Sequence, residues 1–167
     1  MALNTQAQRL AREAIFTRAE LAIIRIIKKR TREGKDVEGR SFKPYSEGYR
    51  RIRQRAGRPT TPVDLNFSNA GGMLDSIEGF IPSTLDKVSI EFNRPDKELL
   101  AYYHNISGAG KGKVIREFFA LSDDESEQVF KNVEELALDL GSNITEDELT
   151  NVLKKLKNNT NTNVKLS

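Results

Sequence analysis

The sequence predicts an α+β fold, in which a small antiparallel sheet packs with a long N-terminal helix and with C-terminal helices. Three patterns carry this prediction: a long helical segment at the start, an alternating apolar segment in the middle and two acidic helix starts near the end. The chain has 167 residues, of which 37% are hydrophobic and 31% are charged, and this suits one modest core. We predict a single domain over residues 1–157 and a disordered polar tail over residues 158–167.

The first element is a helix over about residues 5–32. Thr5 is a candidate N-cap, Gly34 can end the helix, and the cations at 28–32 suit the negative end of the helix dipole. The first half of the helix is otherwise polar, so we expect the second half to be buried and the first half to project as a contact arm. One apolar stripe, for the core or for a contact between subunits, consists of Leu10, Ala14, Leu21 and Ile24.

An arginine-rich helix follows the loop over residues 34–44. Ser46 is its predicted N-cap, and the helix runs to about Ala56. Tyr49, Ile52 and Ala56 share one face and predict a thin buried edge. Five guanidinium groups in nine residues repel one another, so water, an acidic protein surface or nucleic-acid phosphates must compensate them. These candidate interface residues are Arg50, Arg51, Arg53, Arg55 and Arg58.

The middle of the chain predicts the sheet. Residues 87–93 alternate apolar with polar side chains and read as a strand, residues 78–82 as its antiparallel partner, and residues 114–118 as a third strand. Residues 99–103 fit either a short helical turn or a strand. Ser68 or Asn69 can cap a short helix that carries Met73, Leu74 and Ile77. Three glycines predict a mobile loop over 107–113 that carries Lys111 and Lys113.

Two capping boxes predict the C-terminal helices. Ser122 is followed three residues later by Glu125, which begins an acidic helix to about Leu140, and Thr145 begins a last helix in the same way. The charge is therefore unevenly distributed along the chain. Residues 25–58 hold thirteen Lys/Arg against four Asp/Glu, whereas residues 116–150 hold two against eleven. This separation suits nucleic-acid contact by the basic half or head-to-tail contact between like subunits.

No pattern points to catalysis, a cofactor or a metal, so we predict that the protein is not an enzyme. The chain has no cysteine, and its single histidine, His104, lies in no Ser-His-acid pattern. The segment from Gly108 to Lys113 lacks the first glycine and the final hydroxyl of a phosphate-binding loop. The acidic runs at 123–125 and 146–148 suit helix first turns better than metal ligation. The longest apolar run, residues 21–27, is too short for a membrane span, and we expect a soluble, unexported protein.

Four short stretches follow one another in series along the chain: Gly39-Arg-Ser-Phe-Lys-Pro-Tyr-Ser46, Leu65-Asn-Phe-Ser-Asn-Ala-Gly-Gly-Met-Leu-Asp-Ser-Ile77, Ala101-Tyr-Tyr-His-Asn105 and Arg116-Glu-Phe-Phe-Ala-Leu-Ser122. The series spans roughly residues 39–130, and its specificity comes from order and spacing. In this order and spacing it resembles the tail-completion or virion-morphogenesis proteins of tailed bacteriophages. It departs from the pattern of that family at Phe42, where tryptophan is frequent, and before Arg116, where a proline is frequent.

The resemblance implies a structural neck protein of the virion, assembled in the host cytoplasm, that joins head and tail. It implies a ring, a hexamer or a dodecamer, that docks to connector or portal-side proteins and to tail-tube proteins, with double-stranded DNA passing through its channel. We expect Lys111 and Lys113 to lie in a loop that orders on assembly, and Phe42, Phe118 and Phe119 to anchor the core. The alternative is a sequence-nonspecific nucleic-acid-binding protein that uses the helix from Arg50 to Arg58.

Overall fold

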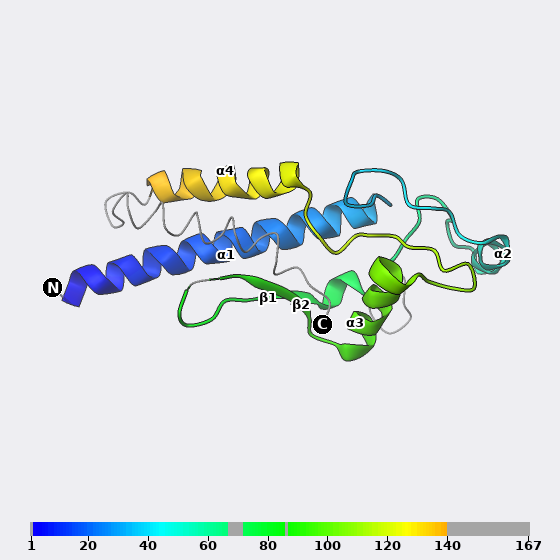
Figure 1. Cartoon of the computed structure of the whole chain (residues 1–167), viewed down its shortest axis with the longest axis horizontal. Coiled ribbons are helices and arrows are strands. Elements are labelled where there is room, and N and C mark those ends of the chain that lie inside the picture. Colours follow the sequence, from blue (N-terminus) through cyan, green and yellow to red (C-terminus); the bar gives the residue numbers. More distant parts are fainter. Residues whose placement is uncertain (1, 67–71, 86, 140–167) are drawn as a thin grey trace. The chain divides into compact units, whose positions relative to one another are not determined.

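The predicted α+β class is confirmed by a computed structural model, which describes residues 2–66, 72–85 and 87–139 (Figure 1). Within these residues the chain forms two compact units. The first unit comprises 2–25, 79–91 and 121–139, and the second comprises 26–78 and 92–120. The predicted domain limits at 157 and 158 lie outside the described residues and stay predictions, as does the last helix from Thr145.

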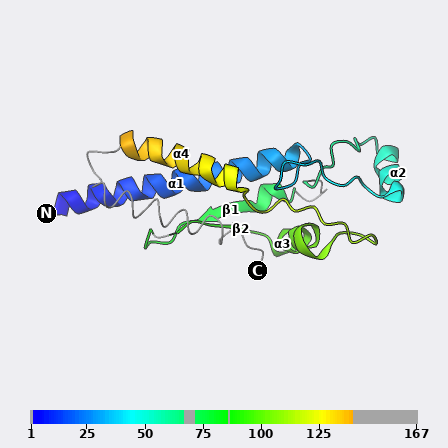
Figure 2. The ribbon, with the colours of Figure 1, turned by 45° about the horizontal axis from the view of Figure 1, so that its top comes forward.

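Helix α1, Ala2–Arg32, is the long blue helix in Figure 2. It contributes residues to both units, and its buried face differs from the predicted one. Leu10 and Leu21 are more than half exposed, so the predicted stripe is wrong. Two of the residues on the buried face of α1 are alanines, Ala11 and Ala19. A search for large apolar residues at helical spacing does not find them. Ala11, Ile15 and Phe16 in the first half of the helix are buried, so these residues are not part of a free arm. The buried apolar side chains of α1 are Ala11, Ile15, Phe16, Ala19, Ile23 and Ile27.

Helix α4, Asp123–Asp139, belongs to the first unit and begins with the predicted capping box. The backbone N–H of Glu125 donates to Ser122 Oγ over 3.3 Å, and the N–H of Ser122 donates to Glu125 Oε2 over 3.0 Å. The two bonds satisfy donors that the first helical turn leaves without a partner. Val129, Val133 and Ala137 form its buried face, so one side of α4 is apolar and the other is exposed.

The sheet consists of two antiparallel strands, β1 (Ile77–Phe80) and β2 (Ser89–Phe92), which confirms two of the three predicted strands. Ile90 and Phe92 are buried and Glu91 is exposed, as the alternating pattern predicts. The third predicted strand, over 114–118, is wrong. Its only ladder pairing among the described residues is an isolated bridge from Val114 to Ala109.

The second unit holds α2 (Glu47–Arg55), the 3₁₀ turn η1 (Leu74–Ser76), α3 (Pro95–Tyr102) and the π-helical turn η2 (Tyr103–Ser107). The ambiguous segment at 99–103 is therefore helical, and α3 continues directly into η2. The caps predicted at Ser68 and Asn69 lie outside the described residues, whereas Asn66 Oδ1 accepts a hydrogen bond from the N–H of Leu74 over 2.6 Å.

The phenylalanine anchors of this unit are confirmed. Phe42, Phe118 and Phe119 are all buried, and the ring of Phe119 lies 4.6 Å from that of Phe92, measured between centroids. The side-chain oxygen of Asn105 accepts hydrogen bonds from the N–H groups of both Phe118 and Phe119, over 2.8 and 2.9 Å. These bonds replace the ladder that a third strand would have made.

Candidate functional site

Three arginines are buried inside the second unit: Arg30, Arg53 and Arg116. Each donates hydrogen bonds to backbone carbonyl groups of irregular segments. These carbonyls have no neighbouring strand to pair with, so the arginine side chains are their hydrogen-bond partners. Arg30, for example, donates from Nη2 to the carbonyls of Phe118 and Ala120 over 2.6 and 2.8 Å. Arg30, at the cationic end of α1, therefore connects the helix to the segment 118–120 in addition to complementing the helix dipole.

Tyr45 is the centre of the other two arginine contacts. The guanidinium carbon of Arg53 lies 4.9 Å from the centroid of the Tyr45 ring, and that of Arg116 lies 5.9 Å from it. The Tyr45 hydroxyl donates to the carbonyl of Asp64 over 2.9 Å and accepts from the Asp64 N–H over 2.7 Å. Burial raises the pKa of the Tyr45 phenol, so it stays a donor over the physiological range.

Arg53 and Arg116 also hold the loops around this ring. Arg53 Nε donates to the carbonyl of Pro59 over 3.0 Å, and Arg116 donates from Nε and Nη2 to the carbonyls of Lys43 and Pro44 over 2.9 and 3.1 Å. Arg53 is only 3% exposed. Its placement among the predicted interface residues is therefore corrected, because this guanidinium is already used inside its own chain.

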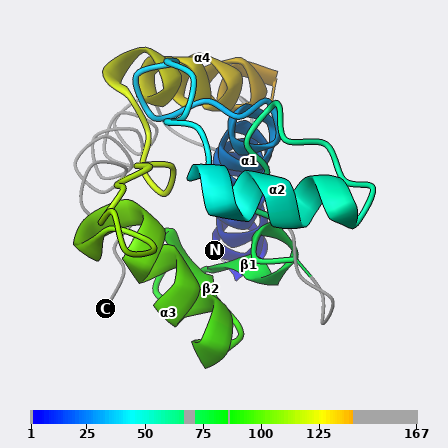
Figure 3. The same cartoon turned by 90° about the vertical axis from the view of Figure 1, so that its right-hand side faces the viewer.

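The other predicted interface arginines, three on α2 and Arg58 after its end, lie closer to the surface. Arg50, Arg51 and Arg55 are exposed, and Arg58 is half-buried. Figure 3 shows the ribbon of α2 in cyan. The predicted buried edge of this helix is wrong, since Tyr49 and Ile52 are 43% and 60% exposed. The only buried side chain of α2 is that of Arg53. The burial of α2 is thus the reverse of the expected one, because a charged side chain is buried and the large apolar side chains are exposed.

A second exposed apolar surface runs along α3 and η2. Leu99, Tyr102 and Tyr103 recur at the spacing of one helix face, Ile106 follows in the π-helical turn, and each of the four is between 39% and 54% exposed. The two tyrosine rings lie 6.1 Å apart between centroids. We call these four residues the α3 row. The sequence spacing of this row could have revealed it, but the segment was ambiguous between helix and strand.

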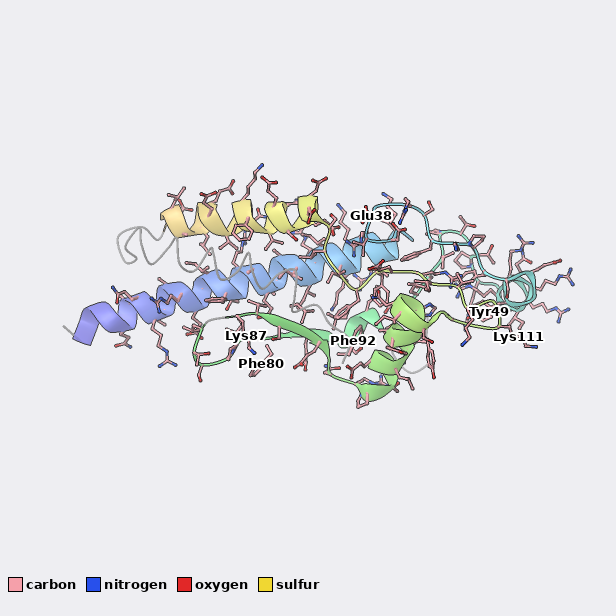
Figure 4. All side chains as sticks on the ribbon, in the orientation of Figure 1. Glu38, Tyr49, Phe80, Lys87, Phe92 and Lys111 are labelled. Carbon is pink, nitrogen blue, oxygen red and sulfur yellow. The ribbon has the colours of Figure 1, made fainter. Side chains whose placement is uncertain are left out.

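The glycine-rich loop after η2 is closed in the single chain. The N–H of Ala109 donates to the carbonyl of Val114 over 2.9 Å, and the reverse bond spans 3.2 Å. Gly108 has a φ of 84°, and a Cβ on it would collide with the Lys113 backbone. Lys111 and Lys113 are exposed, and Figure 4 shows Lys111 near the far end of this loop. These bonds close the loop within the single chain, and the expectation that the loop orders on assembly stays a prediction.

His104 is packed within η2. Its carbonyl accepts a hydrogen bond from the N–H of Arg116 over 2.7 Å, and its Nδ1 is buried without a hydrogen-bond partner in the described part of the chain. Burial, and then the positive charge of Arg116, lower the pKa of His104 to about 4. The imidazole is therefore neutral at pH 7.

The exposed face of α4 is acidic, with one apolar side chain. Leu138 is 69% exposed, and Glu134 and Glu135 lie one turn before it on the same side of the helix. Among the residues that the structure describes, no group of three or more His, Asp or Glu side chains could hold a metal ion. No helix in the same ranges combines the length and the apolar character needed to cross a membrane.

Comparisons of the chain with protein-family models, with curated proteins and with solved structures found no match.

Proposed function

We propose that this chain is a structural protein of the head-tail junction of a tailed bacteriophage, a tail-completion or neck protein that assembles as a ring. The observation that carries the proposal is the α3 row, where four large side chains along α3 and η2 are exposed. Such rows on a soluble surface mark contacts with other proteins. Part of this row, Tyr102 and Tyr103, falls within a stretch that resembles the phage family.

The distribution of charge supports assembly from identical copies. A ring needs two different complementary surfaces on each subunit, since head-to-tail contacts repeat around the axis. The exposed arginines of α2 and the exposed carboxylates of α4 supply one basic and one acidic surface. The ring, a hexamer or a dodecamer, then docks to connector or portal-side proteins and to tail-tube proteins, and DNA passes through its channel within the virion. The protein has no catalytic role in this proposal.

Light scattering of the full chain at several protein and salt concentrations tests the proposal. We expect a defined oligomer that weakens as salt rises, because screening reduces contacts between exposed charges. A variant with Leu99→Ser and Ile106→Ser should keep the folded circular dichroism spectrum and lose incorporation into phage particles that lack this protein. A matched control is Leu10→Ser on α1, which is also an exposed leucine. A chain that stays monomeric under every condition and joins no particle would contradict the proposal.

The second candidate is a sequence-nonspecific nucleic-acid-binding protein, which is favoured by the three exposed arginines of α2. Backbone binding through Z cations gives a slope of about −0.9Z in a plot of log affinity against log salt. The variant Arg50→Ala with Arg55→Ala should reduce that slope by about 2 if DNA is the ligand. Arg9→Ala on α1 is the control. Absence of salt-dependent DNA binding would exclude this candidate.

A further inference from the structure

We infer that the exposed face of α2 in one copy packs against the exposed face of α4 in the next copy, so that these two helices form the repeating contact of the assembly. The inference rests on the proposed function, because it assigns surfaces to the self-assembly proposed above. It concerns contacts between copies and requires two surfaces on each chain.

The α2 surface consists of Arg51, Ile52 and Arg55. Arg51 and Arg55 are four residues apart and Ile52 and Arg55 are three apart, so the three side chains share one side of the helix. This side lies away from Arg53, the only residue that α2 buries. Ile52 is 60% exposed and is flanked by Arg51 and Arg55, of which Arg51 also forms an ion pair with the exposed Glu47 of its own helix. An anionic surface that covers Ile52 would pair with the cations beside it as well as bury the apolar side chain.

The α4 surface consists of Glu134, Glu135 and Leu138. Both carboxylates precede Leu138 by one turn, and all three side chains lie away from Val129, Val133 and Ala137 on the buried face. Leu138 is 69% exposed, the highest value among the exposed large apolar residues that the structure describes. The α4 surface therefore repeats the pattern of α2, one apolar residue with two like charges, but with the opposite sign.

Charge complementarity selects a second copy as the occupant. Two α2 surfaces would oppose four cations, and two α4 surfaces would oppose four anions, so neither self-contact is favoured. Pairing α2 with α4 buries Ile52 against Leu138 and places each guanidinium near a carboxylate, where Arg can bind in a bidentate geometry. Because the two surfaces differ, the contact is head-to-tail and leaves one free surface at each end until a ring closes.

The contact should be weak alone and sensitive to salt. A helix of nine residues is about 14 Å long, so one such contact buries less than the roughly 1,200 Å² of a stable interface. Closure of the ring compensates for the weakness of a single contact, because every copy in a closed ring makes two contacts. Exposed charges are screened within a Debye length of about 8 Å at physiological salt, so dissociation should follow rising salt.

Charge reversal with complementation tests the inference. One variant carries Arg51→Glu and Arg55→Glu, and the other carries Glu134→Lys and Glu135→Lys. All four positions are exposed, so both variants should fold, and circular dichroism checks this. Each variant alone should lose self-association by about tenfold or more in sedimentation velocity. A 1:1 mixture should recover it, since each reversed surface then meets an oppositely charged surface on the other variant.

The matched control reverses two exposed charges elsewhere, Arg9→Glu and Arg18→Glu on α1, and should assemble like the unchanged chain. If the unchanged chain assembles and both reversals leave assembly intact, the α2–α4 contact is overturned while the proposed function stands. If both reversals abolish assembly and the mixture does not recover it, the contact is also overturned. If the unchanged chain never associates, the contact and the proposed function fail together.

Discussion

Replacing Arg53 by alanine should destabilise the second unit, although the sequence places this residue among four other arginines. Its hydrogen bond to the Pro59 carbonyl is a bond from a charged donor, which contributes about 1.5–3 kcal/mol. Its position over the Tyr45 ring adds about 0.5–2 kcal/mol. The 3.8 Å ion pair with the partly exposed Asp64 adds less than about 1 kcal/mol. We therefore expect Arg53→Ala to lower the free energy of unfolding by about 2–5 kcal/mol.

Urea denaturation followed by circular dichroism measures this loss, and the same helix provides the control. Arg55→Ala removes an exposed guanidinium and should change the free energy of unfolding by no more than about 0.5 kcal/mol. Arg53→Lys keeps the charge but loses the planar fork, so its effect should lie between the two. Equal stability of Arg53→Ala and Arg55→Ala would refute the structural role of Arg53.

Three further predictions concern histidine, asparagine and a helix cap. His104 has a pKa of about 4 in the folded chain and 6.5 in the unfolded chain, so the unfolded chain binds the proton first as the pH falls. The contribution of His104 to the free energy of unfolding is complete above pH 6.5 and falls by at most about 3 kcal/mol as the pH drops toward 4. His104→Gln should flatten this part of the stability profile, and an unchanged slope would contradict the assignment. Asn105→Ala leaves the N–H groups of Phe118 and Phe119 without their acceptor and should cost about 2–4 kcal/mol, with faster hydrogen exchange at both amides, whereas Asn105→Asp keeps an acceptor. Ser122→Ala should cost about 1 kcal/mol and Ser122→Asp much less; equal losses in urea would argue against the cap.

Local signals in the sequence predicted much of the fold. The capping serines at Ser46 and Ser122 begin α2 and α4 as expected, because a side-chain oxygen can satisfy helical N–H groups whatever the rest of the chain does. The alternation at 87–93 predicted β2, since its period is set by the pleat of the strand itself. Each of these signals depends on residues within one element.

The errors came from contacts between distant residues. The buried edge of α2 was assigned to Tyr49 and Ile52, but Arg53 is buried instead because the Tyr45 ring and the Pro59 carbonyl provide its partners. Arginine that is buried and paired looks the same in sequence as arginine in water. The third strand failed for a similar reason, because the Asn105 side chain accepts the hydrogen bonds that a neighbouring strand would have taken.

The candidate surfaces were predictable only in part. The charge counts in the sequence identify the basic and the acidic segment. Which of their side chains face outward follows only from the buried residues of α2 and α4, which the structure shows. Ile52 and Leu138 are exposed, so each of the two charged helices also presents an apolar side chain that a partner can bury. Neither residue stands out in the sequence from the apolar residues of the core.

Native mass spectrometry of the full chain at low and high ionic strength tests the central claim, self-assembly through unlike surfaces, most directly. The account predicts a closed oligomer of one stoichiometry at low ionic strength that dissociates to the 18.9 kDa subunit as ionic strength rises. Only the single subunit under every condition, or an open series of masses without a preferred number of copies, would contradict it.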